Sequence, residues 1–137
     1  MDTAIILEVQ NLLTGFAWHA DRGDGKGLAA LFLPDAVLNV GGVDIRGSDE
    51  IGADCHRRFQ KGPRKTRHVW SNLRIEKISN EEVITVAVQM TFEQTTPELP
   101  TQLRLNDVFD TFRRDSNGAL RFARRLIKRE MAVSIAP

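Results

Sequence analysis

The second half of the chain is built from long stretches in which apolar and polar residues alternate. Four such stretches cover approximately residues 66–78, 82–95, 102–114 and 119–133, separated by the turn sequences SNEE, TPELP and DSNG. A period of two is typical of β-strands, because successive side chains point to opposite faces of a sheet. The pattern predicts a meander of four antiparallel strands, which limits the chain to folds with one large sheet.

The second stretch shows the clearest alternation. Its apolar set, predicted to form the buried face, is Ile84, Val86, Val88, Met90 and Phe92. Its other set, predicted to form the wetter face, is Thr85, Ala87, Gln89, Thr91 and Glu93.

The first stretch is less regular. His68, Trp70 and Asn72 share one phase, whereas Leu73 and Ile75 share the other. If both sets face the interior, a β-bulge must separate them, and bulges often lie beside functional sites because they redirect side chains. The final stretch also changes phase along its length, or has a mixed face.

Three helices are predicted before the meander. Asp2, Asp24 and Ser48 can each cap a helix, because a short side-chain oxygen accepts hydrogen bonds from free backbone N–H groups. The first helix then ends near Asp21, the second covers 26–32 and stops at Pro34 and Asp35, and the third ends before Gly62 and Pro63. Between the last two, residues 36–40 and 43–46 predict a short hairpin around two glycines.

The order of these elements predicts an α+β fold, with three N-terminal helices packed on a curved, mostly antiparallel mixed sheet. Such a sheet can enclose a cone-shaped pocket beneath the helices. The 137 residues fit one domain, 1–137.

Composition restricts the partners. The formal net charge is +1, and the basic residues between Arg57 and Arg67 are interpreted as a solvated face rather than a nucleic-acid site. One cysteine, Cys55, excludes an intramolecular disulfide, fits a reducing cytoplasm and disfavours a structural metal. The N-terminal sequence resembles no signal peptide, and no stretch is apolar enough for a membrane span. We therefore expect a cytoplasmic protein that binds neither nucleic acid nor membrane.

Histidine is the side chain best suited to proton transfer near neutral pH, because its unperturbed pKa is about 6.5. The chain has three, His19, His56 and His68. His56 lies among charged residues, which indicates a surface position, and His19 either lines a pocket or fills the core. His68 begins an amphipathic strand, where on its own a structural role is the simpler interpretation.

Several segments together resemble a known family. They are FAWHADRGDGKGLAALFLPDAVL at 16–38, RGSDEI at 46–51, RHVWSN at 67–72 and the closing FRRDSNGALRFARRLI. In combination they resemble the nuclear transport factor 2-like superfamily, in its SnoaL-like branch, over almost the whole chain. The resemblance implies a cone-shaped α+β barrel with a small-molecule pocket, and a homodimer or higher homo-oligomer.

Within that branch, TRHVWSNLRIEKISNEEVI is similar to a strand pair of the scytalone dehydratase family. The resemblance implies that Asp21, which ends the first helix, holds His68 in the pocket. A carboxylate that accepts from one imidazole nitrogen leaves the other free to take a proton. Asp21 and His68 are therefore the predicted catalytic pair.

The departures from relatives are informative. The chain has no tyrosine, whereas scytalone dehydratases use tyrosines and a second pocket histidine, near whose position Glu93 stands here. Ketosteroid isomerases need an aspartate base where this chain has Val40. Enolate stabilisation would then need other donors, such as Asn72, a tryptophan or His19.

The sequence predicts a cofactor-independent lyase or isomerase of a hydrophobic, enolisable small molecule, with no metal. The predicted substrate-binding residues are Phe16, Trp18, His19, Phe59, Trp70, Asn72, Met90 and Phe109. Asp107 or Asp110 is a further candidate, because a buried carboxylate is costly unless it is used. The alternative is a non-catalytic binding or assembly module, including a role like that of the β subunits of ring-hydroxylating dioxygenases.

Overall fold

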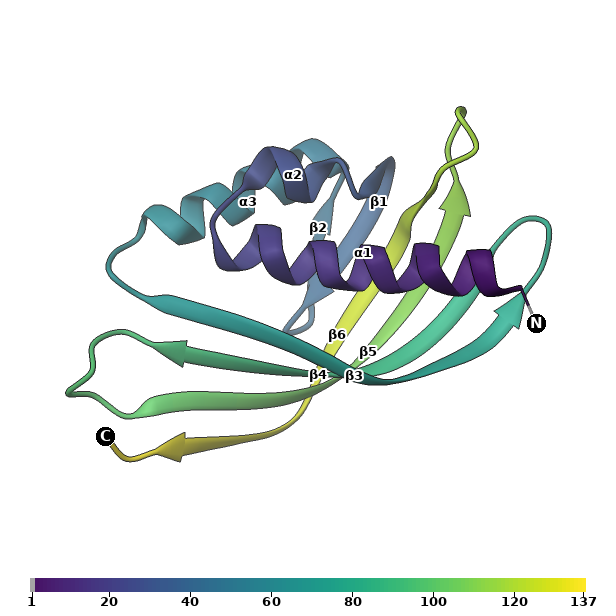
Figure 1. The fold of residues 1–137 in the computed structure, drawn as a ribbon. Coiled ribbons are helices and arrows are strands. Elements are labelled where there is room, and N and C mark those ends of the chain that lie inside the picture. The colour runs from purple at the N-terminus through teal and green to yellow at the C-terminus, as the bar shows by residue number, and fades with distance from the viewer. Residues whose placement is uncertain (1) are drawn as a thin grey trace.

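The computed structural model describes residues 2–137, which form two layers. Three helices lie on one face of a six-stranded sheet, and the opposite face carries no helix (Figure 1). The helices are α1 (Thr3–Asp21), α2 (Gly25–Ala29) and α3 (Ser48–Gln60). The strands are β1 (Phe32–Val40), β2 (Val43–Arg46), β3 (Lys65–Ile78), β4 (Val83–Gln94), β5 (Thr101–Arg114) and β6 (Leu120–Ile135).

The strand order in the sheet is β2-β1-β6-β5-β4-β3. All neighbours are antiparallel except β1 and β6, which run parallel. The predicted α+β fold, with its mixed and mostly antiparallel sheet, is confirmed. The sheet is open, with β2 and β3 as its edges, so the cone-shaped barrel that the resemblance implied is not closed.

Helix α1 begins and ends where the sequence indicated. The Asp2 carboxylate accepts hydrogen bonds from the backbone N–H groups of Ala4 and Ile5, at 3.0 and 3.3 Å. Apolar side chains along one face of the helix are buried in the core, and this packing supplies most of the stability of the helix. They are Val9, Leu12, Leu13 and Phe16.

Two predicted helix boundaries are wrong. The second helix ends at Ala29, and Phe32, Pro34 and Asp35 belong to β1. Proline lacks a donor for a strand ladder, and here the register between β1 and β6 shifts between Phe32 and Val37, so the irregular stretch accommodates it. Ser48 is the first helical residue of α3 rather than its cap; the cap is Gly47, with φ 88°.

The predicted burial of β4 is inverted. The residues that face the helices are the more polar set, with Thr85, Gln89 and Thr91 at most 6% exposed. The apolar set predicted to be buried, including Val88 and Met90, lies on the other face and is only half-buried. The inner face of the sheet is therefore rich in polar groups, which is unusual for a core and indicates a site.

The predicted bulge in β3 is confirmed. Its register with β4 shifts between Ser71 and Arg74, and Asn72 has a positive φ of 54°. Trp70 and Leu73, which have opposite phases in the sequence, both pack against the core as a result. The final strand changes phase as well, because the register between β5 and β6 shifts next to Phe112 and Phe122.

Candidate active site

The last residue of α1 and the start of β3 meet beneath the helices. The Asp21 Oδ1 atom lies 2.5 Å from the His68 Nδ1 atom. The other carboxylate oxygen accepts the backbone N–H of His68 at 3.1 Å, and the Thr66 hydroxyl donates to Oδ1 at 3.3 Å. Asp21 is 7% exposed. Three contacts to β3 therefore hold a carboxylate that is almost completely buried.

These contacts define the state of the imidazole. A carboxylate is an acceptor, so neutral His68 carries its proton on Nδ1 and donates it to Asp21. Among residues 2–137, no side chain or backbone group hydrogen-bonds to His68 Nε2. The Phe16 ring packs against the imidazole in a T-shaped arrangement, with a centroid distance of 6.0 Å.

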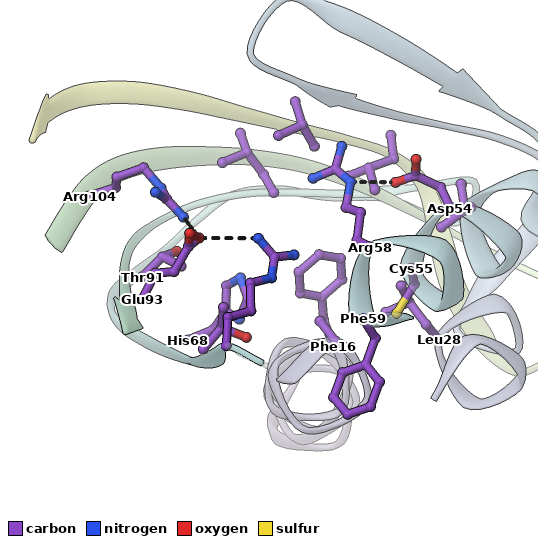
Figure 2. Close-up of a pocket in the computed structure, with 17 residues that line it drawn as sticks. Phe16, Leu28, Asp54, Cys55, Arg58, Phe59, His68, Thr91, Glu93 and Arg104 are labelled. Carbon is purple, nitrogen blue, oxygen red and sulfur yellow. Dashed lines mark hydrogen bonds and ion pairs between the residues drawn. The ribbon is translucent and has the colours of Figure 1, made fainter. Parts of the chain in front are cut away.

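His68 lines a cavity of about 150 Å³ between the helices and the sheet. Figure 2 shows Arg104 and Glu93 at one side, Cys55 and Leu28 at the other, and His68 and Phe16 between them. The apolar part of the lining is Phe16, Ala20, Leu28, Leu38, Val40, Ile51, Phe59 and Ile127. The polar part is Asp54, Cys55, Arg58, Arg64, Thr66, His68, Thr91, Glu93 and Arg104.

Ion pairs hold the charged side of the cavity in place. Glu93 accepts from Arg104 at 2.9 Å and from Arg64 at 3.3 Å. Partial burial opposes ionisation of Glu93, but the hydrogen bond from Arg104 and the two positive charges together keep its pKa below the usual value. On the helix side, Arg58 Nε pairs with Asp54 at 2.9 Å (Figure 2).

The charged side of the cavity was not predicted from the sequence. Arg58 and Arg64 were predicted to lie on a solvated basic face; both are exposed, and both also line the cavity. Glu93 lies on the face opposite Val88 and Met90, as predicted, but that face is the inner one. The signal was present in the polar phase of β4, which ends in Gln89, Thr91 and Glu93.

The predicted substrate-binding residues separate into two groups. Phe16 and Phe59 line the cavity with His68. The other six lie outside its lining. Trp18 is 56% exposed beneath the guanidinium of Arg22, and His19 Nδ1 lies 3.0 Å from the carboxylate of Asp24.

The remaining four are on or near the sheet. Trp70 donates from Nε1 to the Thr14 hydroxyl at 3.0 Å, which ties β3 to α1. Asn72 is exposed at the bulge. Met90 and Phe109 lie on the face of the sheet that the helices do not cover.

Asp110, not Asp107, is the inward carboxylate of β5. It is 1% exposed and pairs with Arg125 at 3.5 Å, and Arg125 also donates to Gln89 at 3.1 Å. Burial raises the pKa of Asp110 to about 6, although the charge of Arg125 opposes the rise. The Arg125 guanidinium lies 4.2 Å from the centre of the Phe16 ring, so this pair supports a wall of the cavity from behind.

The structure of residues 2–137 also bears on metals and membranes. Among these residues, no group of three or more histidine, cysteine, aspartate or glutamate side chains is arranged to hold a metal ion. No helix in that part of the chain has the length and apolar character needed to cross a membrane.

The chain was compared with known proteins. The family model described as SnoaL-like domain matches residues 2–126. No curated protein matches the chain significantly.

Many solved structures share the fold. A protein named Putative Scytalone Dehydratase, from Novosphingobium aromaticivorans, has a TM-score of 0.83 at 22% identity, with 98% of this chain and 93% of that chain covered. A hexachlorocyclohexane dehydrochlorinase, LinA type 2, has a TM-score of 0.85 at 17% identity, with coverages of 97% and 90%. A Catenulispora acidiphila protein in complex with S-DNPA has a TM-score of 0.76 at 20% identity, with coverages of 94% and 96%.

Proposed function

Because the chain belongs to the SnoaL-like domain family, we propose that it is a cofactor-independent lyase or isomerase of a hydrophobic, enolisable small molecule. The observation that carries the proposal is the contact between Asp21 and His68 at the wall of a cavity. A histidine paired with a carboxylate in a cleft is a recurrent arrangement in catalytic sites.

His68 is the proposed proton carrier. With Nδ1–H donated to Asp21, the Nε2 lone pair is free to remove a proton from a carbon beside a carbonyl group. Asp21 then stabilises the imidazolium that forms, as a fixed carboxylate does in other histidine-based sites. Return of the proton to a different carbon completes an isomerisation, and departure of a leaving group completes an elimination.

The cavity lining supports the same proposal. Phe16, Ile51 and Phe59 offer an apolar wall for the body of a substrate. Thr91, directly opposite His68 in the β3–β4 ladder, offers a hydroxyl donor for the oxygen of an enolate. Two structural neighbours are named a dehydratase and a dehydrochlorinase, and both names describe eliminations.

Proton exchange tests the proposal without knowledge of the natural substrate. We expect the protein to exchange the α-protons of 2-tetralone with deuterated solvent, measured by proton NMR. Substitution His68→Ala should slow the catalysed exchange by about 100-fold or more, because a general base contributes about 10²- to 10⁴-fold. His56→Ala, at an exposed position on α3, is the matched control and should exchange as the wild type does.

Equal rates in the wild type and His68→Ala would contradict a role for His68. Binding of 2-tetralone and related ketones without any exchange would favour the alternative, a binding module that has kept the fold.

A further inference from the structure

A second hollow adjoins the cavity and shares His68 with it. Its volume is about 340 Å³, and it is lined by Val40, Gly41, Arg58, His68, Gln89, Thr91, Arg104, Asn106, Ile127 and Arg129. Three of these residues are arginines, and none is an aspartate or glutamate. Arg58 and Arg104 line both spaces, so they lie where the cavity and the hollow join.

The register of the sheet explains why these groups gather. His68, Thr91 and Arg104 are directly paired across β3, β4 and β5. The next inward row pairs Asn106 of β5 with Arg129 of β6. Residues in such rows have neighbouring side chains on one face, so most of the hollow is built by the sheet, with Arg58 added from α3 and Gly41 from the turn after β1.

Two buried polar side chains in the hollow lack protein partners. Asn106 is 5% exposed and Thr91 is 6% exposed. Within residues 2–137, neither the Asn106 amide nor the Thr91 hydroxyl hydrogen-bonds to another protein group. Their polar atoms stay open to the hollow rather than sealed in the core, so the amide and the hydroxyl are available to hydrogen-bond a polar ligand there.

The charged side chains around the hollow indicate that such a ligand would be negatively charged. Arg58 and Arg104 each have one carboxylate partner, Asp54 and Glu93, and guanidinium groups carry further N–H donors beyond those bonds. Arg129 has no carboxylate partner among the described residues. Asp21 lies behind His68 and lines neither space. The hollow therefore has an excess of positive charge and of hydrogen-bond donors.

We propose that this hollow, formed by Arg58, Arg104, Arg129 and Asn106, binds a carboxylate group of the substrate. Guanidinium groups match the planar, two-oxygen geometry of a carboxylate. The inference rests on the proposed function: it names the substrate class as apolar compounds that carry one carboxylate. With the carboxylate in the hollow and the apolar body in the cavity, the carbon between them lies against His68, which lines both spaces.

Binding calorimetry on the full chain tests this inference. The probes are 3-phenylpropanoate and its neutral counterpart 3-phenyl-1-propanol. We expect the wild type to bind the carboxylate about tenfold or more tightly than the alcohol, because charge-assisted hydrogen bonds are about twice as strong as neutral ones. Raising the salt concentration should weaken only the binding of the carboxylate.

Arg129→Gln is the cleanest variant, because it breaks no ion pair seen among the described residues. It should reduce the preference for the carboxylate by about fivefold, whereas Arg129→Lys, which keeps the charge but loses the planar fork of donors, should reduce the preference less than Arg129→Gln does. Arg74→Gln is the matched control, since Arg74 is an exposed arginine of β3 that lines neither space. Circular dichroism checks that each variant is folded.

Equal affinities of the wild type for the two probes would overturn the inference. Tighter binding of 2-phenylethyl phosphate than of the carboxylate would overturn it as well, by showing a phosphate site. The proposed function is tested separately: loss of proton exchange with the carboxylate preference intact contradicts only the proton chemistry, and exchange without the preference contradicts only the carboxylate site.

Discussion

Asp110 and Arg125 form a buried ion pair that the proposed chemistry does not use. The Asp110 oxygens accept no hydrogen bond from any described residue, and the contact with Arg125 is long, at 3.5 Å. A buried charge that is poorly hydrogen-bonded is costly, which is why burial raises the pKa of Asp110. The pair should therefore make the stability of the fold depend on pH.

The direction of that dependence follows from the pKa. The pKa of Asp110 rises from 3.8 to about 6 on folding, so between these values the folded state binds more protons than the unfolded state. Stability from this group is present below pH 4 and is lost as the pH rises through 6, by up to about 3 kcal/mol. Asp110→Asn removes this titration.

We therefore expect the free energy of unfolding of the wild type, relative to Asp110→Asn, to fall between pH 4 and pH 7. Urea unfolding of both proteins across that range measures the difference. A difference that is constant or that rises with pH would show that Arg125 keeps Asp110 ionised throughout.

At the residue level, the sequence could supply only part of the site. The Asp21–His68 pair followed from the family resemblance, since no local pattern links residues 47 positions apart. Arg104 could not be distinguished from a surface arginine, because its position depends on which face of the sheet turns inward. Aromatic residues such as Trp18 were chosen for their chemistry alone, and the structure places Trp18 in solvent.

Helices α2 and α3 approach each other through their backbones. A Cβ atom built on Gly52 would lie 2.5 Å from the carbonyl oxygen of Gly25, and one on Gly25 would lie 2.3 Å from the carbonyl oxygen of Gly52. Glycine is required at both positions because a backbone atom cannot move aside as a side chain can. This close contact positions Ile51 and Cys55 of α3 at the wall of the cavity.

We expect Gly52→Ala to destabilise the protein by about 1–3 kcal/mol, because the added methyl group overpacks the contact. A loss of stability is unusual for this substitution, since alanine normally stabilises a helix interior relative to glycine by about 1 kcal/mol. Gly15→Ala in α1 is the matched control: its Cβ would meet only the Leu31 side chain, at 3.3 Å, and its cost should be smaller. Urea unfolding measures both, and a Gly52→Ala variant as stable as the wild type would contradict the close contact.

At the level of elements, periodicity predicted the strands closely but not their faces. The four strands of the meander begin and end within two residues of the predicted limits. The prediction assigned the two faces of β4 the wrong way round, because in most sheets the apolar face is the buried one. Here the inner face surrounds a polar site, and apolar side chains such as Val88 and Met90 lie on the uncovered face.

In the whole molecule, the site exists only because the two layers are assembled. Asp21 ends α1, His68 lies on β3, and the ladder from β3 to β6 brings the arginines beside them. The sequence predicted this two-layer α+β arrangement, since helices followed by a meander have few ways to bury one apolar face each. The open edge of the sheet and the contents of the cavity depend on long-range register, which no local pattern contains.

The central claim is that the assembled fold holds His68 with its proton on Nδ1 and leaves Nε2 free. Nitrogen-15 NMR of the imidazole, recorded in alkaline buffer where histidine is neutral, measures this directly. We expect a protonated Nδ1 and an unprotonated Nε2 for His68 in the wild type, and a mixture of both neutral forms in Asp21→Ala. A proton on Nε2 in the wild type, or the same mixture of forms in both proteins, would contradict it.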